Sequence, residues 1–152
     1  MGERMRRLEV VFSRAPIYFV TACTHERRKI LARAEVYRRL LEFAEGGPVR
    51  GAWLGAVVLM PDHWHAFVAL DDEKGPAVGD WVKGLKNALS RALRDAGCES
   101  PHWQRGFFDH VLRSDESYAE KWDYVRENPV RAGLVAKAEE WPHFGEVFAL
   151  RR

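Results

Sequence analysis

The sequence predicts an α+β domain in which helices lie on one face of an antiparallel sheet. Two observations predict this class. Short β-branched and aromatic segments alternate along the chain with amphipathic ones. Two of the apolar segments are also separated by a break too short to hold a helix, as in an antiparallel strand pair. Over 152 residues, a hydrophobic content of 47% suits one domain with its own core, so we treat residues 1–152 as a single domain.

The first half of the chain is predicted to supply three strands and one helix. The expected elements are, in order, strand 16–23, helix 34–45, strand 50–59 and strand 63–70. The strands are rich in β-branched and aromatic residues, whereas the helix carries Val36, Leu40 and Ala44 at helical spacing. Two glycines and a proline at 46–48 end that helix.

The second half is predicted to add two helices and one strand. The expected elements are helix 77–95, strand 102–113 and helix 115–128, and the tail at 136–152 is left unassigned. Gly106 allows a bulge in the strand, and Pro129 ends the last helix because the residue before a proline avoids α geometry. The resulting order, β-α-β-β-α-β-α, is close to the split βαβ, or ferredoxin-like, layout.

Composition narrows the function classes. The apolar runs are too short to cross a bilayer, and the charged N-terminal residues do not resemble a signal peptide. Two cysteines are too few for a disulfide framework, which favours a cytoplasmic setting. The net charge of +2 is compatible with a nucleic-acid partner without requiring one.

The segment MPDHWHAFVAL, residues 60–70, places two histidines at the start of a buried strand. Alternation along a strand directs His63 and His65 to one side and Trp64 to the other. Two imidazoles on one face can bind the same divalent ion. A catalytic site needs a further ligand from elsewhere, and an isolated pair of this kind is also compatible with histidines that are merely solvated.

The predicted helix at 115–128 contains two tyrosines in different sectors. Tyr118 shares an apolar stripe with Trp122 and Val125, which indicates packing. Tyr124 instead shares a polar sector with Asn128 and Lys121. A phenol is a weak nucleophile at neutral pH, but it can form a covalent phosphodiester intermediate when its target is activated.

Three motifs together resemble a known family. They are MPDHWH, WQRGFFDHVLRS and YVRENPVRAGLV, in this order. The chain resembles the single-tyrosine HUH transposases, named for their His-hydrophobic-His motif, and especially the REP-associated tyrosine transposases. The resemblance extends over about residues 14–135.

The resemblance implies a metal-assisted DNA transposase. It implies Mg²⁺ or Mn²⁺ held by His63 and His65, with Asn128 as a third ligand and Tyr124 as the nucleophile. Attack by the tyrosine on single-stranded DNA would leave a 5′-phosphotyrosine and a free 3′-hydroxyl, which can reverse the reaction and join strands. Hairpins or palindromes are the expected substrates, and both a homodimer and a monomer remain open.

DNA contacts are predicted at basic residues, because cations bind the phosphate backbone. The candidates are Arg105, Arg131, Lys83, Lys86, Arg91 and Lys121. Two other functions remain open for the same site: a metal-dependent nicking nuclease that does not rejoin strands, and a domesticated protein that binds palindromes without turnover.

Overall fold

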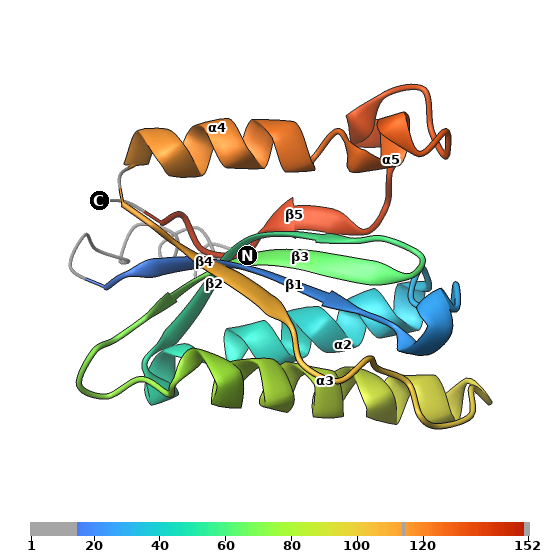
Figure 1. Cartoon of the computed structure of the whole chain (residues 1–152), viewed down its shortest axis with the longest axis horizontal. Helices are drawn as coiled ribbons and strands as arrows, with labels where there is room; N and C mark the ends of the chain where they lie inside the picture. The colour runs from blue at the N-terminus through green and yellow to red at the C-terminus, as the bar shows by residue number, and fades with distance from the viewer. Residues whose placement is uncertain (1–14, 114, 151–152) are drawn as a thin grey trace.

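The computed structural model describes residues 15–113 and 115–150, which form a five-stranded antiparallel sheet with strand order β4-β1-β3-β2-β5 (Figure 1). The main elements are β1 (Ile17–Cys23), α2 (Ala34–Glu45), β2 (Ala52–Leu59), β3 (His63–Leu70), α3 (Val78–Asp95), β4 (Phe108–Leu112), α4 (Asp115–Val125), α5 (Asn128–Arg131) and β5 (Phe144–Glu146). Short 3₁₀ helices occupy His25–Arg27, Pro48–Arg50 and Ala138–Glu140.

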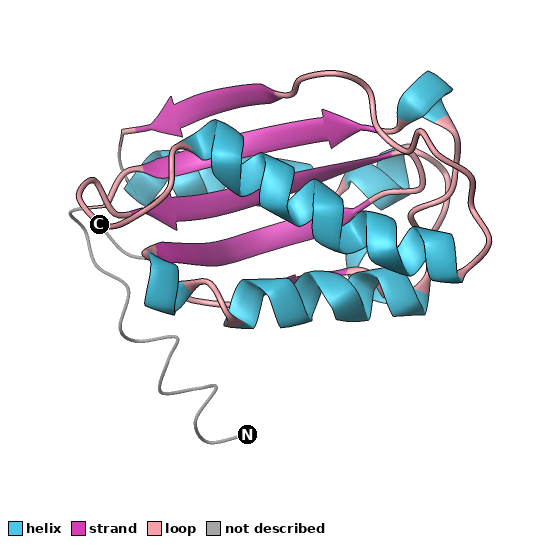
Figure 2. Ribbon diagram, turned by 90° about the horizontal axis from the view of Figure 1, so that it is seen from below, coloured by secondary structure: helices cyan, strands magenta, loops and turns pink. Residues whose placement is uncertain are grey.

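Helices cover both faces of this sheet (Figures 1 and 2). α2 and α3 lie together on one face, where Trp64 of β3 meets Trp81 of α3 with ring centroids 6.2 Å apart. α4 lies on the other face, where Phe67 of β3 meets Tyr118 of α4 at 5.0 Å. β3, in the middle of the sheet, therefore presents alternate side chains to two different helical layers.

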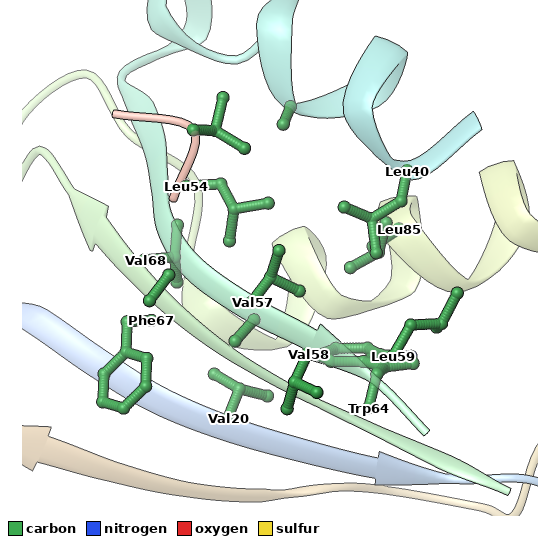
Figure 3. Packing of buried hydrophobic residues seen from close by; sticks show 14 of the residues in the cluster. Val20, Leu40, Leu54, Val57, Val58, Leu59, Trp64, Phe67, Val68 and Leu85 are labelled. Carbon is green, nitrogen blue, oxygen red and sulfur yellow. The ribbon is translucent and has the colours of Figure 1, made fainter. Parts of the chain in front are cut away.

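The main core lies between the sheet and the α2–α3 layer. Leu40 of α2 and Leu85 of α3 are fully buried there, as are Leu54 and Val57 of β2 (Figure 3). The longest helix, α3, is amphipathic, with its apolar side on the sheet. Among residues 15–113 and 115–150, no helix has both the length and the apolar character needed to span a bilayer.

The predicted α+β class and ferredoxin-like order are confirmed, with two additions. The split βαβ helices, α2 and α3, share one face of the sheet as expected. The opposite face is also apolar, and there Phe67 packs against Tyr118 and Trp122 of α4. The unassigned tail supplies β5, which pairs with β2 at the sheet edge.

Two predicted boundaries are wrong. The strand predicted at 102–113 is confined to Phe108–Leu112, because Gly106 adopts a positive φ of 80° and the preceding residues form a loop tied to Thr24 by one bridge at Trp103. The helix predicted at 115–128 ends at Val125, and a separate short helix starts at Asn128. In both segments, local backbone geometry interrupts an element that side-chain pattern alone would continue.

The hydroxyl of Tyr118 accepts a hydrogen bond from the irregular part of β2. The register of β2 against β3 shifts between Leu54 and Val57, which leaves the Ala56 N–H outside the regular ladder. This N–H donates to the Tyr118 hydroxyl at 3.1 Å, and the hydroxyl donates to Glu146 at 2.9 Å. Tyr118 thus joins α4 to β2 and β5, in agreement with its predicted packing role.

Replacing Tyr118 with Phe should lower the free energy of unfolding by about 1–3 kcal/mol, because the buried Ala56 N–H loses its acceptor. Urea unfolding followed by circular dichroism measures the change. Tyr124→Phe is the matched control: its ring is 62% exposed, and its loss of a hydroxyl should change stability by less than about 0.5 kcal/mol. Equal stability of the two variants would contradict the structural role of Tyr118.

Candidate functional site

The two histidines of β3 lie together on the face that α4 partly covers. Their ring centroids are 4.8 Å apart in an edge-to-face arrangement. Between them, Trp64 is fully buried on the opposite face. The predicted sidedness of His63, His65 and Trp64 is therefore confirmed, and it follows from the alternation of a regular strand.

Each imidazole is held through its Nδ1 atom. Asp62 Oδ1 lies 2.8 Å from Nδ1 of His63, and an ionised carboxylate can only accept, so this Nδ1 carries the proton and donates. Thr21 Oγ1 lies 2.7 Å from Nδ1 of His65. With both Nδ1 atoms engaged, the Nε2 atoms are the ones left to bind a metal ion.

The carboxylate of Asp62 is itself anchored. Arg27 forms a salt bridge with it at 3.0 Å. Burial alone would raise the pKa of Asp62, but the hydrogen bond and charge of His63, together with Arg27, hold that pKa below its ordinary value. The partner of His63 is therefore an anion at neutral pH.

His65 is neutral under the same conditions. Burial, together with the smaller effects of the charges of His63, Lys121 and Arg131, lowers the pKa of His65 to about 3. A neutral imidazole keeps the lone pair that a metal ligand requires. The effect of Lys121 and Arg131 also indicates that α4 and α5 bring positive charge close to this histidine.

Tyr124 lies on the exposed side of α4. Its side chain is 62% exposed, whereas Tyr118 is buried and Trp122 is half-buried against the sheet. Tyr124 borders an open hollow of about 390 Å³ between α4 and β4, which is also lined by His110 and Lys121. The hydroxyl of Tyr124 is therefore accessible to a large substrate.

Asn128 lies across a helix junction from Tyr124, because α4 ends before it and α5 begins with it. Arg131 connects the two. Its guanidinium lies 3.9 Å from the centre of the Tyr124 ring, donates to the Tyr124 carbonyl at 2.8 Å, and donates to Asn128 Oδ1. The sequence predicted Tyr124 and Asn128 one turn apart on a single helix; in the structure they lie in two helices, and Arg131 contacts both.

The six predicted DNA contacts fall into separate places. Lys121 lies 5.0 Å above the ring of Phe19, which in turn stacks on His65, so Lys121 belongs to the site together with Arg131. Lys83 and Arg91 are exposed on α3, in the helical layer on the opposite face of the sheet.

Lys86 and Arg105 lie near the loop that precedes β4. Lys86 donates to the carbonyls of Gln104 and Gly106 at 3.2 and 2.8 Å. Burial lowers the pKa of Lys86, in keeping with this structural contact. Arg105 is exposed in the same loop and is available to a ligand.

Few side chains at the site could coordinate a metal ion. In the part of the chain that the structure describes, no group of three or more His, Cys, Asp or Glu side chains is placed to hold an ion. The two imidazoles, each held at its Nδ1 atom, leave two Nε2 atoms that suit a divalent ion with open positions, and the predicted third ligand is the carboxamide oxygen of Asn128. Of the two ions predicted, Mn²⁺ accepts imidazole nitrogen more readily than Mg²⁺ does.

Four further residues of this face were not among the predicted site residues. Asp62 directly precedes His63, so its role could have been inferred from the motif, whereas Thr21 meets His65 only through the pairing of β1 with β3. Phe108 pairs with Thr21 from the other side and is 73% exposed. His110 pairs with Phe19 and borders the Tyr124 hollow. The last two became visible only once β4 was placed at the edge of the sheet.

Sequence comparisons find relatives among transposases, although no family model matches the chain. A Haemophilus influenzae protein provisionally named a REP-associated tyrosine transposase is 28% identical over 149 residues, covering 87% of this chain and 80% of that protein. The Escherichia coli REP-associated tyrosine transposase is 28% identical over 89 residues, covering 59% of this chain and 51% of that protein.

Structural comparisons find the same fold. A REP-associated tyrosine transposase bound to a REP hairpin superimposes with a TM-score of 0.66 at 21% identity, covering 88% of this chain and 78% of that one. A crystal structure from Deinococcus radiodurans, provisionally named a transposase, gives a TM-score of 0.55 at 21% identity, covering 76% and 92%. Motifs, sequence likeness and fold agree: the chain is a relative of the REP-associated tyrosine transposases.

Proposed function

We propose that this protein cleaves and rejoins single-stranded DNA at hairpin or palindromic sites, with Tyr124 as the nucleophile. The observation that carries the proposal is the position of an accessible tyrosine in one contact network with Asn128 and Arg131, whose charge acts on His65 of the histidine pair. The solved relative bound to a REP hairpin supports hairpin DNA as the substrate.

The proposed reaction is a transesterification. The Tyr124 oxygen forms a bond to the scissile phosphorus, and the bond from phosphorus to the 3′-oxygen breaks. The phenolic proton passes to solvent, and the departing 3′-oxygen takes up a proton. The products are a 5′-phosphotyrosine on the protein and a DNA 3′-hydroxyl, which can attack the phosphotyrosine and restore a phosphodiester.

The metal ion of this proposal, Mg²⁺ or Mn²⁺, would be held by His63, His65 and Asn128. When bound, it supplies Lewis acidity that withdraws charge from phosphorus. Asp62 and Thr21 orient the two imidazoles through their Nδ1 atoms. The burial of His65 keeps that ring unprotonated and ready to bind.

The surface around Tyr124 suits a single strand of DNA. Lys121 and Arg131 provide positive charge beside the histidines, and Arg105 is exposed near the start of β4. The exposed ring of Phe108 lies on the same face of the sheet as His65. Thr21 of β1 pairs with Phe108 of β4 on one side and with His65 of β3 on the other, and paired residues point to the same face. An unstacked base can pack on such a ring, and phosphates can bind the cations.

Replacing Tyr124 with Phe should abolish both cleavage and the covalent adduct, because no other group replaces the phenol oxygen. The assay incubates a labelled single-stranded hairpin with protein and Mn²⁺ and resolves adduct and cut strand on a denaturing gel. Tyr118→Phe is the matched control and should retain the adduct in the folded fraction.

Two outcomes of that assay would contradict the proposal. Cleavage that persists in Tyr124→Phe without an adduct would identify a nicking nuclease. Hairpin binding by the wild type without any cleavage would identify a palindrome-binding protein.

Replacing Thr21 with Val should weaken Mn²⁺ binding about 10–100-fold, because His65 loses the partner that fixes its tautomer and ring orientation. Titration calorimetry without DNA measures the affinity directly. Thr21→Ser keeps the hydroxyl and should bind as the wild type does. Equal affinities of the Val and Ser variants would rule out this orienting role.

A further inference from the structure

Arg131 joins the proposed nucleophile to one of the proposed metal ligands, Asn128. One guanidinium lies against the Tyr124 ring, donates to the Tyr124 carbonyl and donates to the Asn128 carboxamide oxygen. Its charge is also one of those that act on His65. A cation in contact with this many parts of the proposed site does more than attract DNA.

We infer that Arg131 is a positioning residue that withholds Asn128 from the metal ion until a DNA phosphate is bound. In the free protein its guanidinium holds Asn128 Oδ1. When a phosphate of the substrate binds the guanidinium, Arg131 releases the carboxamide, and Asn128 completes the metal site. The inference rests on the proposed function, since it assumes that a divalent ion and a DNA phosphate meet at this site.

The direction of the exchange follows from charge. Guanidinium binds a phosphate through two parallel charge-assisted hydrogen bonds, which are stronger than its hydrogen bond to a neutral amide. An amide oxygen that accepts from a guanidinium is a poor ligand for a divalent ion, because the two cations repel each other across that oxygen. Phosphate binding removes this conflict.

The remaining contacts explain how the exchange can occur without moving the nucleophile. Arg131 keeps its hydrogen bond to the Tyr124 carbonyl and its stacking on the Tyr124 ring, so that ring stays in place while Asn128 is released. Arg131 is exposed, so a phosphate can reach it without opening the fold.

Release of Asn128 by a DNA phosphate would couple DNA binding to metal binding. If DNA binding releases a metal ligand, then DNA raises metal affinity and the metal raises DNA affinity by the same factor. The complete metal site then forms only where a substrate phosphate is present.

The test measures Mn²⁺ affinity in the absence of DNA, from the electron paramagnetic resonance signal of the free ion. Arg131→Met removes the guanidinium and keeps an unbranched side chain, so Asn128 is released. We expect it to bind Mn²⁺ at least about 5-fold more tightly than the wild type. Thermal unfolding checks that the variant is folded.

Two further variants separate release of Asn128 from loss of charge. Lys121→Met also removes one positive charge that acts on His65. Because the described contact of Lys121 is with Phe19 and not with Asn128, the Mn²⁺ affinity of this variant should increase clearly less than that of Arg131→Met. Asn128→Ala should bind Mn²⁺ with the affinity of the wild type. The double variant Asn128→Ala with Arg131→Met should gain no more Mn²⁺ affinity than Lys121→Met does.

The outcomes distinguish this inference from the proposed function. Equal gains for Arg131→Met and Lys121→Met, or a full gain that persists without Asn128, would overturn the positioning role and leave the metal site intact. Failure of the wild type and all variants to bind Mn²⁺ would overturn the metal site and the inference together. Adduct formation at Tyr124, measured separately, tests the proposed function.

Discussion

The site depends on the alternation of β3. This strand runs through the centre of the sheet between β1 and β2, so both of its faces are covered by other parts of the chain. Trp64 is buried beneath α3, and the residues on either side of it, His63 and His65, are directed to the other face. A shift of one residue in the pairing of β3 would turn both imidazoles toward α3 and the indole toward the face that α4 partly covers.

Like β3, α4 has one buried side and one side that contributes to the site. Its apolar side, with Tyr118 and Trp122, packs on Phe67 of β3, and the Tyr118 hydroxyl secures the irregular part of β2. This packing leaves Tyr124 and Lys121 on the exposed side of the helix. One strand and one helix, each buried along one side, therefore direct the histidines and the tyrosine to the same face of the molecule.

The sequence predicted α2 and β3 at their observed bounds, since both have unbroken patterns that agree with burial. It also predicted which tyrosine packs and which is exposed, because helical spacing alone separates Tyr118 from Tyr124. It could not predict that α4 covers the histidine face, nor that the tail adds β5. Those features depend on which strand edge and which sheet face remain available after the split βαβ unit has formed.

The contacts around the site show the same limit. Asp62 adjoins His63 in sequence, but Thr21 reaches His65 only through strand register, and Phe108 and His110 join this face only through the edge position of β4. Arg131 was predicted as a DNA contact from its motif. Its hydrogen bond to Asn128 joins two residues three apart in α5, whereas its contacts with Tyr124 cross the break between α4 and α5, which the side-chain pattern did not predict.

The central claim is that the Tyr124 phenol comes within reach of an ion held by the histidine pair, in one subunit or across two. Paramagnetic relaxation tests it directly in protein carrying fluorinated tyrosine, with each resonance assigned by substitution to Phe. Added Mn²⁺ should broaden the Tyr124 signal first and much more than that of Tyr37 on α2, and His63→Ala with His65→Ala should remove the difference. A Tyr124 signal that stays sharp while Mn²⁺ binds to the intact histidine pair would contradict the account.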